Sequence, residues 1–167
     1  AHAACALGGE KRMHTSSEHA VNPQPTYHFP TPLSSFIGRR QEVAAVIDLL
    51  ATTRLLTLTG AGGSGKTRLA LRVAEQLAAA ARYPGGIWFV ELAGLADGAL
   101  VAQTVAAALG VREQPGRDLA AMAADFFGNR AALLILDNCE HIGAACAAWG
   151  AACLRACPKL TILATSR

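Results

Sequence analysis

Short apolar runs alternate along the chain with longer segments in which apolar residues recur every three or four positions. The runs predict strands at 55–59, 87–92, 133–136 and 160–165. The periodic segments predict helices at about 40–51, 66–81, 97–109, 118–127 and 142–156. Strands that are apolar throughout are typical of parallel sheets covered on both faces. The pattern therefore predicts a three-layer α/β fold with helices on both sides of a parallel sheet.

The first 32 residues break this pattern, because they contain four prolines, a Gly-Gly pair and a Ser-Ser pair. Such a composition favours extended backbone over a packed core. We expect residues 1–32 to form a flexible tail or linker whose last few residues dock on the domain. The domain itself is expected to comprise residues 33–167.

Residues 60–67 read Gly-Ala-Gly-Gly-Ser-Gly-Lys-Thr, which is the phosphate-binding pattern G-x-x-x-x-G-K-T between a predicted strand and a predicted helix. Its glycines let backbone N–H groups turn inward toward a phosphate chain, and the helix adds the positive end of its dipole. The alternative is a glycine-rich turn without a ligand. The context favours the first interpretation, so the chain is expected to bind a nucleoside tri- or diphosphate with Mg²⁺. The expected contact residues are Gly60, Gly62, Gly63, Ser64, Gly65, Lys66, Thr67 and Arg68.

Candidate chemistry lies at the ends of the last two strands. Asp137 follows the apolar strand 133–136 and is expected to hold Mg²⁺ together with the Thr67 hydroxyl. Asn138 can orient a water but is a poor base. Glu140 has two open roles, activation of a water or capping of the next helix. Arg167, after the strand 160–165, is a candidate sensor of the γ-phosphate.

Composition excludes several other classes of protein. The net charge of +3 is spread along the 167 residues, which does not by itself support nucleic-acid binding. No apolar stretch approaches the length of a membrane span, and no signal peptide is apparent. The cysteines at 139, 146, 153 and 157 are expected to form one apolar helical stripe rather than a zinc site or disulfides. A reducing, cytoplasmic location follows.

Taken in order, four segments of this chain resemble the STAND-class (NB-ARC-like) ATPases. The segments are 36–39 (Phe-Ile-Gly-Arg), 60–67, 133–141 (Leu-Leu-Ile-Leu-Asp-Asn-Cys-Glu-His) and 163–167 (Leu-Ala-Thr-Ser-Arg). The sequences of these segments are most similar to those of the ATPase modules of large bacterial transcriptional regulators of the LuxR and BTAD-containing kinds. The resemblance covers about residues 30–167.

This resemblance implies ATP and ADP as the nucleotides and adds site residues. Ile37, Gly38 and Arg39 match the segment that packs beside adenine, and Arg167 matches the sensor arginine. The implied strand order is 5-1-4-3-2, with the sensor strand between the P-loop and Walker B strands. Two departures stand out. Arg40 replaces the usual glutamate, and the sequence ends at Arg167, before a fifth strand and the closing subdomains are expected.

Two main functions are open on this basis. The first is a slowly hydrolysing ATP/ADP switch of a signal-responsive transcriptional regulator, which self-associates in its ATP state and contacts DNA only through other domains. The alternative is a fast AAA+-type ATPase or another P-loop NTPase. A fragment with little activity is a third possibility.

Overall fold

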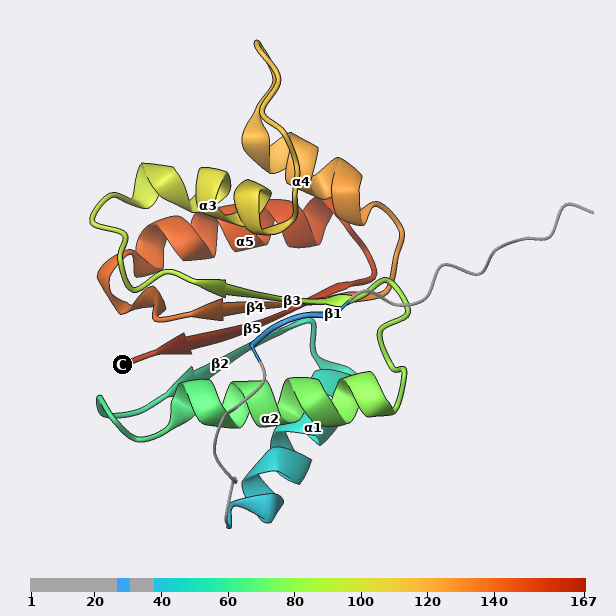
Figure 1. Ribbon diagram of the computed structural model, residues 1–167, viewed down its shortest axis with the longest axis vertical. Coiled ribbons are helices and arrows are strands. Elements are labelled where there is room, and N and C mark those ends of the chain that lie inside the picture. The colour runs from blue at the N-terminus through green and yellow to red at the C-terminus, as the bar shows by residue number, and fades with distance from the viewer. Residues whose placement is uncertain (1–26, 31–37) are drawn as a thin grey trace, which may run out of the picture.

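In the computed structural model, the described residues are 27–30 and 38–167, and a five-stranded parallel sheet runs through them (Figure 1). The strands are β1 (Tyr27–His28), β2 (Leu55–Thr59), β3 (Ile87–Glu91), β4 (Ala132–Asp137) and β5 (Leu160–Ser166). The helices are α1 (Arg40–Thr52), α2 (Lys66–Ala79), α3 (Val101–Ala108), α4 (Leu119–Phe127) and α5 (Gly143–Ala156), with 3-10 turns η1 (Gly98–Leu100) and η2 (Cys139–His141). The predicted parallel α/β fold is confirmed.

The strand order is β1-β3-β4-β5-β2. The strand that leads into the loop at 60–67, β2, pairs with β5, and β5 in turn pairs with β4. The strand before Arg167 therefore lies between the strand before this loop and the strand that ends at Asp137, as the resemblance implied for the sensor strand. Within the described residues β2 forms one edge of the sheet.

The opposite edge is formed by β1, which comes from the segment expected to be a tail. Tyr27 and His28 lie in register with Ile87 and Trp88 of β3. The His28 ring stacks on the indole of Trp88, with 6.2 Å between the ring centroids. Part of this segment therefore docks on the sheet, while residues 1–26 and 31–37 lie outside the described part of the chain.

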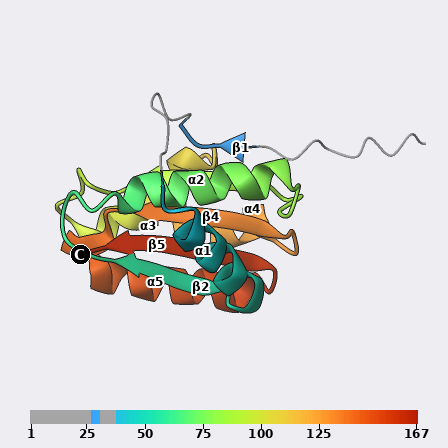
Figure 2. The ribbon, with the colours of Figure 1, turned by 90° about the horizontal axis from the view of Figure 1, so that it is seen from below.

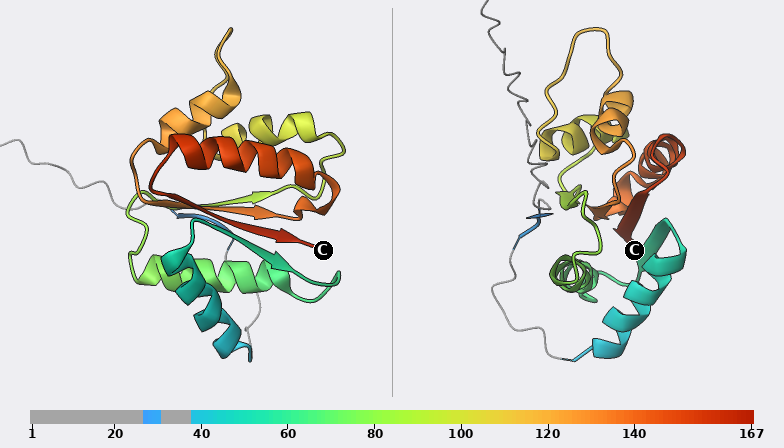
Figure 3. Two further views of the ribbon diagram at one scale, coloured as in Figure 1. Left: turned by 180° about the vertical axis from the view of Figure 1, so that it is seen from behind. Right: turned by 90° about the vertical axis from the view of Figure 1, so that its right-hand side faces the viewer.

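Helices cover both faces of the sheet (Figures 2 and 3), and a cluster of buried apolar residues lies on each face. On one face, α1 and α2 pack against buried side chains that include Leu133, Ile135 and Leu163. On the other face, α3, α4 and α5 pack against Leu134, Leu136 and other buried residues. Every residue of β4 is buried, as expected for a central strand with helices above and below.

Local signals in the sequence set several helix ends. The side chain of Asp118 accepts a hydrogen bond from the Ala121 amide at the start of α4. Asp97 accepts one from the Ala99 amide, but the chain first makes the 3-10 turn η1, so α3 begins only at Val101. No helix in the described part of the chain is long and apolar enough to cross a membrane.

The expected helical stripe of cysteines is only partly correct. Cys146 and Cys153 lie on α5, whereas Cys139 lies in η2 and Cys157 follows the helix. The helix begins after η2 because the chain must first turn away from the end of β4. All four cysteines are free and buried, so they pack in the core as expected.

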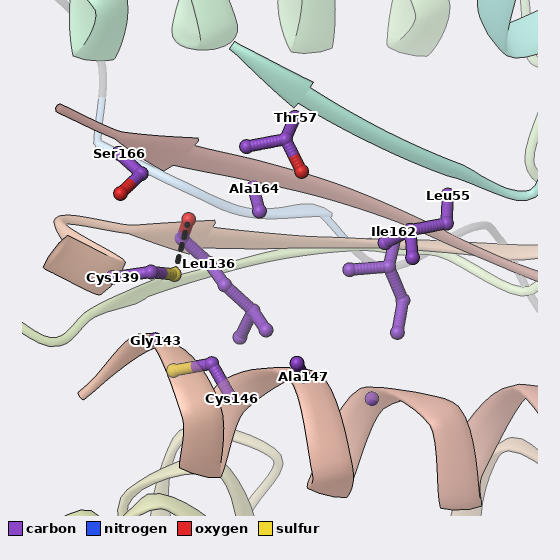
Figure 4. A pocket seen from close by; sticks show the side chains of 11 residues that line it. Leu55, Thr57, Leu136, Cys139, Gly143, Cys146, Ala147, Ile162, Ala164 and Ser166 are labelled. Carbon is purple, nitrogen blue, oxygen red and sulfur yellow. Dashed lines mark hydrogen bonds between the residues drawn. The ribbon is translucent and has the colours of Figure 1, made fainter. Parts of the chain in front are cut away.

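An apolar groove of about 180 Å³ lies between α5 and the β2 edge of the sheet (Figure 4). Leu55, Ile162 and Ala164 line it from the strands, and Cys146 and Ala147 line it from α5. Leu55, on the edge strand β2, is 52% exposed. The apolar surface of this edge strand is therefore only partly covered.

Candidate nucleotide-binding site

The candidate residues meet at one edge of the sheet because the strands are parallel. The carboxyl end of β2 leads into the loop at 60–67, β4 ends at Asp137, and β5 ends directly before Arg167. Figure 1 shows these ends on the side of the C-terminus. Ligands of open α/β sheets bind at this edge. The fold thus brings together residues that are up to about a hundred positions apart in the sequence.

The loop at 60–67 leads directly into the first turn of α2, and its glycines shape the backbone there. Gly65 has a φ of +80° and occupies the N-cap position of that helix, a backbone conformation that disfavours any residue with a side chain. Gly62 lies under the guanidinium of Arg167, since a Cβ on this glycine would be 3.6 Å from an Arg167 nitrogen. The glycines therefore supply both a turn and a close approach, at the positive end of a helix dipole.

Lys66 is held over the loop by the loop's own carbonyl groups. Its ammonium group donates to the carbonyl oxygens of Gly60 at 2.8 Å and Ala61 at 3.0 Å, and lies 3.5 Å from the Ser64 hydroxyl. The positive charge is therefore placed inside the turn that the sequence predicts to surround phosphate groups. Arg68 follows in the first turn of α2 and is exposed.

Asp137 is almost fully buried, with 1% of its surface exposed, and polar groups surround its carboxylate. The Thr67 hydroxyl lies 2.9 Å from each carboxylate oxygen. The side-chain amide of Asn138 donates to Oδ2 at 3.2 Å. The two residues predicted to bind Mg²⁺ are therefore in direct contact, 70 positions apart in the sequence.

Thr165 completes this cluster, and the sequence did not point to it. Its hydroxyl donates to Asp137 Oδ1 at 2.7 Å and accepts a hydrogen bond from the backbone N–H of Asn138 at 3.0 Å. Asn138 has a φ of +62°, and the hydroxyl of Thr165 fixes this left-handed turn directly after β4. One signal was available in the sequence, because Thr165 is a hydroxyl residue near the carboxyl end of a mainly apolar strand, and the structure buries it fully.

Glu140 pairs with Arg167 instead of capping α5. The distance from Arg167 Nε to Glu140 Oε1 is 3.3 Å. The N-cap position of α5 is Ile142, which makes no side-chain cap. The second carboxylate oxygen of Glu140 is buried and has no hydrogen-bond partner among the described residues. The geometry therefore brings the candidate base and the candidate sensor together.

Arg39, directly before α1, also contacts the loop at 60–67. Its Nη1 donates to the Ser64 carbonyl at 2.8 Å, and the guanidinium also pairs with Glu42. The hydrogen bond from Arg39 lowers the pKa of Glu42, and the same contact raises the pKa of Arg39. Arg39 is thus anchored to the loop, next to Gly38, while Ile37 lies outside the described residues.

The donor set fits Mg²⁺ and does not fit zinc. Mg²⁺ prefers oxygen ligands and commonly takes only one or two protein groups, with phosphate and water completing its shell. The buried carboxylate of Asp137 and the hydroxyl of Thr67 are such groups. Among the described residues, no group of three or more His, Cys, Asp or Glu side chains is placed to hold a metal. The pKa of the Cys139 thiol is raised by its hydrogen bond with Cys146 and by burial, which disfavours a thiolate ligand.

Comparison with known proteins agrees with this geometry. The protein-family model described as "AAA domain" matches residues 50–165. A Mycobacterium bovis protein named "Putative HTH-type transcriptional regulator" is 51% identical over 119 residues, which cover 71% of this chain and 13% of that protein. A Mycobacterium tuberculosis protein of the same description matches with the same identity and coverage. An "Uncharacterized protein" of Mycobacterium tuberculosis is 43% identical over 134 residues, covering 80% of this chain and 34% of that protein. The chain thus spans about a third or less of the length of these relatives.

Proposed function

Because the chain belongs to the AAA domain family, which implies nucleotide binding, we propose that it is an ATP- and ADP-binding switch module that hydrolyses ATP slowly. The observation that supports this most directly is the contact of Thr67 with Asp137 beside the loop at 60–67. It joins the predicted phosphate-binding element to the predicted metal ligand at the edge of the sheet where ligands bind.

Each side chain has a place in this proposal. The amides of the loop and the Lys66 ammonium bind the phosphate chain, and Thr67 and Asp137 hold Mg²⁺. When bound, Mg²⁺ supplies positive charge that neutralises the phosphate oxygens. Arg39 and Gly38 are proposed to contact the base of the nucleotide, a role that the family resemblance also implies for Ile37.

Slow hydrolysis follows from the residues after β4. The position next to Asp137 holds an amide, Asn138, whose side chain donates to Asp137. An amide orients water but takes up no proton. Glu140 is the candidate base, and its Oε1 is paired with Arg167. For Glu140 to accept a proton from water, this pair must separate or be rearranged.

Arg167 is the candidate sensor in the switch. Its side chain is 65% exposed and lies next to Gly62, in the loop where we propose that the phosphate chain binds. A γ-phosphate competes with Glu140 for Arg167, whereas ADP lacks that phosphate. The two nucleotides thereby favour different arrangements of the same residues, which is what a switch requires.

The wider role is part of the proposal as well. The relatives named as HTH-type transcriptional regulators support a role in a signal-responsive, STAND-class regulator of the LuxR or BTAD-containing kind. In such a protein, located in the cytoplasm, the ATP state self-associates and other domains contact DNA. These proposed properties concern a longer protein, since this chain matches 13% of the length of the Mycobacterium bovis regulator.

Steady-state ATP turnover distinguishes the switch from a motor of the same family. A switch is expected to turn over well below ~1 per second, whereas a motor reaches that rate or exceeds it. Asp137→Asn is expected to abolish the remaining Mg²⁺-dependent turnover. Arg72→Gln, on the exposed side of α2, is the matched control and is expected to behave as the wild type. A wild-type rate at or above ~1 per second contradicts the switch.

A further inference from the structure

A polar pocket lies at the amino ends of the strands, on the opposite edge of the sheet from the loop at 60–67. It has a volume of about 310 Å³ and is called the basal pocket here. Arg54 at the start of β2, Arg82 before β3 and Lys159 before β5 all line it. None of its lining residues is acidic. Cations that are dispersed in the sequence therefore converge on one concave surface.

Arg54 is held rigidly in the wall of this pocket. Its Nη1 donates to the carbonyl oxygens of Leu154 at 2.9 Å and Cys157 at 3.0 Å, at the end of α5. These two bonds use one of the three guanidinium nitrogens, and the fork has five N–H groups in total. A cation whose position is already fixed loses little conformational entropy when it binds an anion.

Arg82 and Lys159 are exposed, and neither forms an ion pair with a carboxylate in the part of the chain that the structure describes. Complementing a helix dipole is the ordinary role of a cation at this edge, and Arg54 fulfils it directly. Three helices, α1, α2 and α5, end near this edge, but the three cations line the same hollow and therefore repel one another. An anion between them would remove the repulsion.

One hydroxyl group adds hydrogen-bonding capacity to the same surface. Thr161 from β5 lines the basal pocket, as do Thr52 and Thr53, whose hydroxyls already donate to the Leu49 carbonyl. A phosphate has several acceptor oxygens and up to two charges, so it can contact three cations and a hydroxyl at once. A carboxylate has two oxygens and one charge, which leaves part of this donor set unused.

We propose that the basal pocket binds the phosphate group of a small ligand, at a site separate from the nucleotide site. The basal pocket and the nucleotide site are far apart, because β2 alone places about 17 Å between Arg54 and the loop that follows Thr59. The proposal rests on the basal residues and does not depend on nucleotide binding at Lys66.

The test is a titration of the chain with inorganic phosphate, followed by backbone amide NMR, with acetate as the monoanionic control. Saturable shifts are expected for the amides of Thr53, Lys159 and Thr161 with phosphate and not with acetate. Phosphate also binds phosphate-binding loops, so the amides of 62–67 report that site separately. Lys66→Ala removes the shifts at 62–67 and is expected to leave the basal shifts unchanged.

Two charge-removing variants complete the test. Lys159→Gln is expected to weaken phosphate binding at the basal amides about fivefold, as for loss of one partly exposed charge contact. Arg112→Gln removes another exposed cation, which does not line the pocket, and is expected to have no effect. Shifts confined to 62–67 overturn the proposal, as do basal shifts that acetate reproduces or that Lys159→Gln leaves intact. Much tighter binding of a short DNA duplex at the same amides would replace the small ligand with a nucleic-acid backbone.

Discussion

Arg167 and Glu140 form an ion pair beside the phosphate-binding loop, with 3.3 Å between Nε and Oε1. Arg167 is the more exposed partner, at 65%, and Glu140 is the more buried, at 15%. Arg167, which is proposed to sense the γ-phosphate, thus forms an ion pair with Glu140, which is proposed to act as a base. Exchange of Arg167 between a carboxylate and a phosphate would link sensing to hydrolysis.

Arg167→Gln is therefore expected to lower the affinity for ATP about tenfold and to leave that for ADP nearly unchanged, since one charge-assisted hydrogen bond is lost. Titration with each nucleotide, followed by fluorescence or calorimetry, measures the two affinities. Arg155→Gln, an exposed cation in the last turn of α5, is the control. Equal weakening of ATP and ADP binding would argue that Arg167 does not distinguish them.

Thr165→Val tests whether the hydroxyl positions Asp137. Valine keeps the shape of threonine, but it removes the donor to Asp137 and the acceptor for the Asn138 amide. We expect a loss of about 1–3 kcal/mol in the free energy of unfolding and a weaker dependence of ATP binding on Mg²⁺. Thr104→Val removes a hydroxyl from α3 and serves as the control. Lower stability with an unchanged Mg²⁺ dependence would reduce Thr165 to a packing role.

Much of the fold was predictable because its signals are local. The fully apolar run that became β4 indicated a central strand, and Asp118 marked the start of α4. The loop at 60–67 carries its chemistry in consecutive residues, so its position between β2 and α2 could be expected. The strand order came from the family resemblance, because hydropathy does not specify which strands are neighbours.

Other features were not predictable because they depend on tertiary contacts. The pairing of Glu140 with Arg167 depends on how η2 meets the end of β5. From the sequence, Glu140 could act either as a base or as a helix cap. Thr165 forms hydrogen bonds with Asn138 and Asp137, which lie 27 and 28 positions earlier in the sequence. The short strand β1 has too few residues for a periodic signal, and it forms by pairing with β3. The cations of the basal pocket meet only after the sheet has formed.

Cys153 gives a prediction about pH. Burial raises the pKa of this thiol to about 12, so the folded chain holds the proton more tightly than the unfolded chain does. The contribution of the thiol to stability is complete below its ordinary pKa of 9.0 and declines as the pH rises toward 12. The stability advantage of the wild type over Cys153→Ala should therefore shrink between these values in urea unfolding. An advantage that stays constant would mean that the thiol is not desolvated.

A pair of leucine substitutions tests the position of β2 at the sheet edge. Leu163 on β5 is fully buried, so Leu163→Ala is expected to cost about 2–5 kcal/mol of unfolding free energy. Leu55 on β2 is 52% exposed. Leu55→Ala is expected to cost less than about 1 kcal/mol, as for most surface positions. Urea unfolding measures both, and equal costs would mean that Leu55 is covered in solution.

The central claim is that the loop at 60–67 binds nucleotide through Lys66. Calorimetric titration of the wild type, Lys66→Ala and Arg72→Ala with ADP and ATP, each with Mg²⁺, tests it most directly. We expect the wild type and Arg72→Ala to bind both nucleotides, and Lys66→Ala to bind at least about tenfold more weakly, because the ammonium group that it lacks is proposed to contact phosphate oxygens. A folded wild type that binds neither nucleotide, or a Lys66→Ala variant that binds as well as the wild type, would contradict the account.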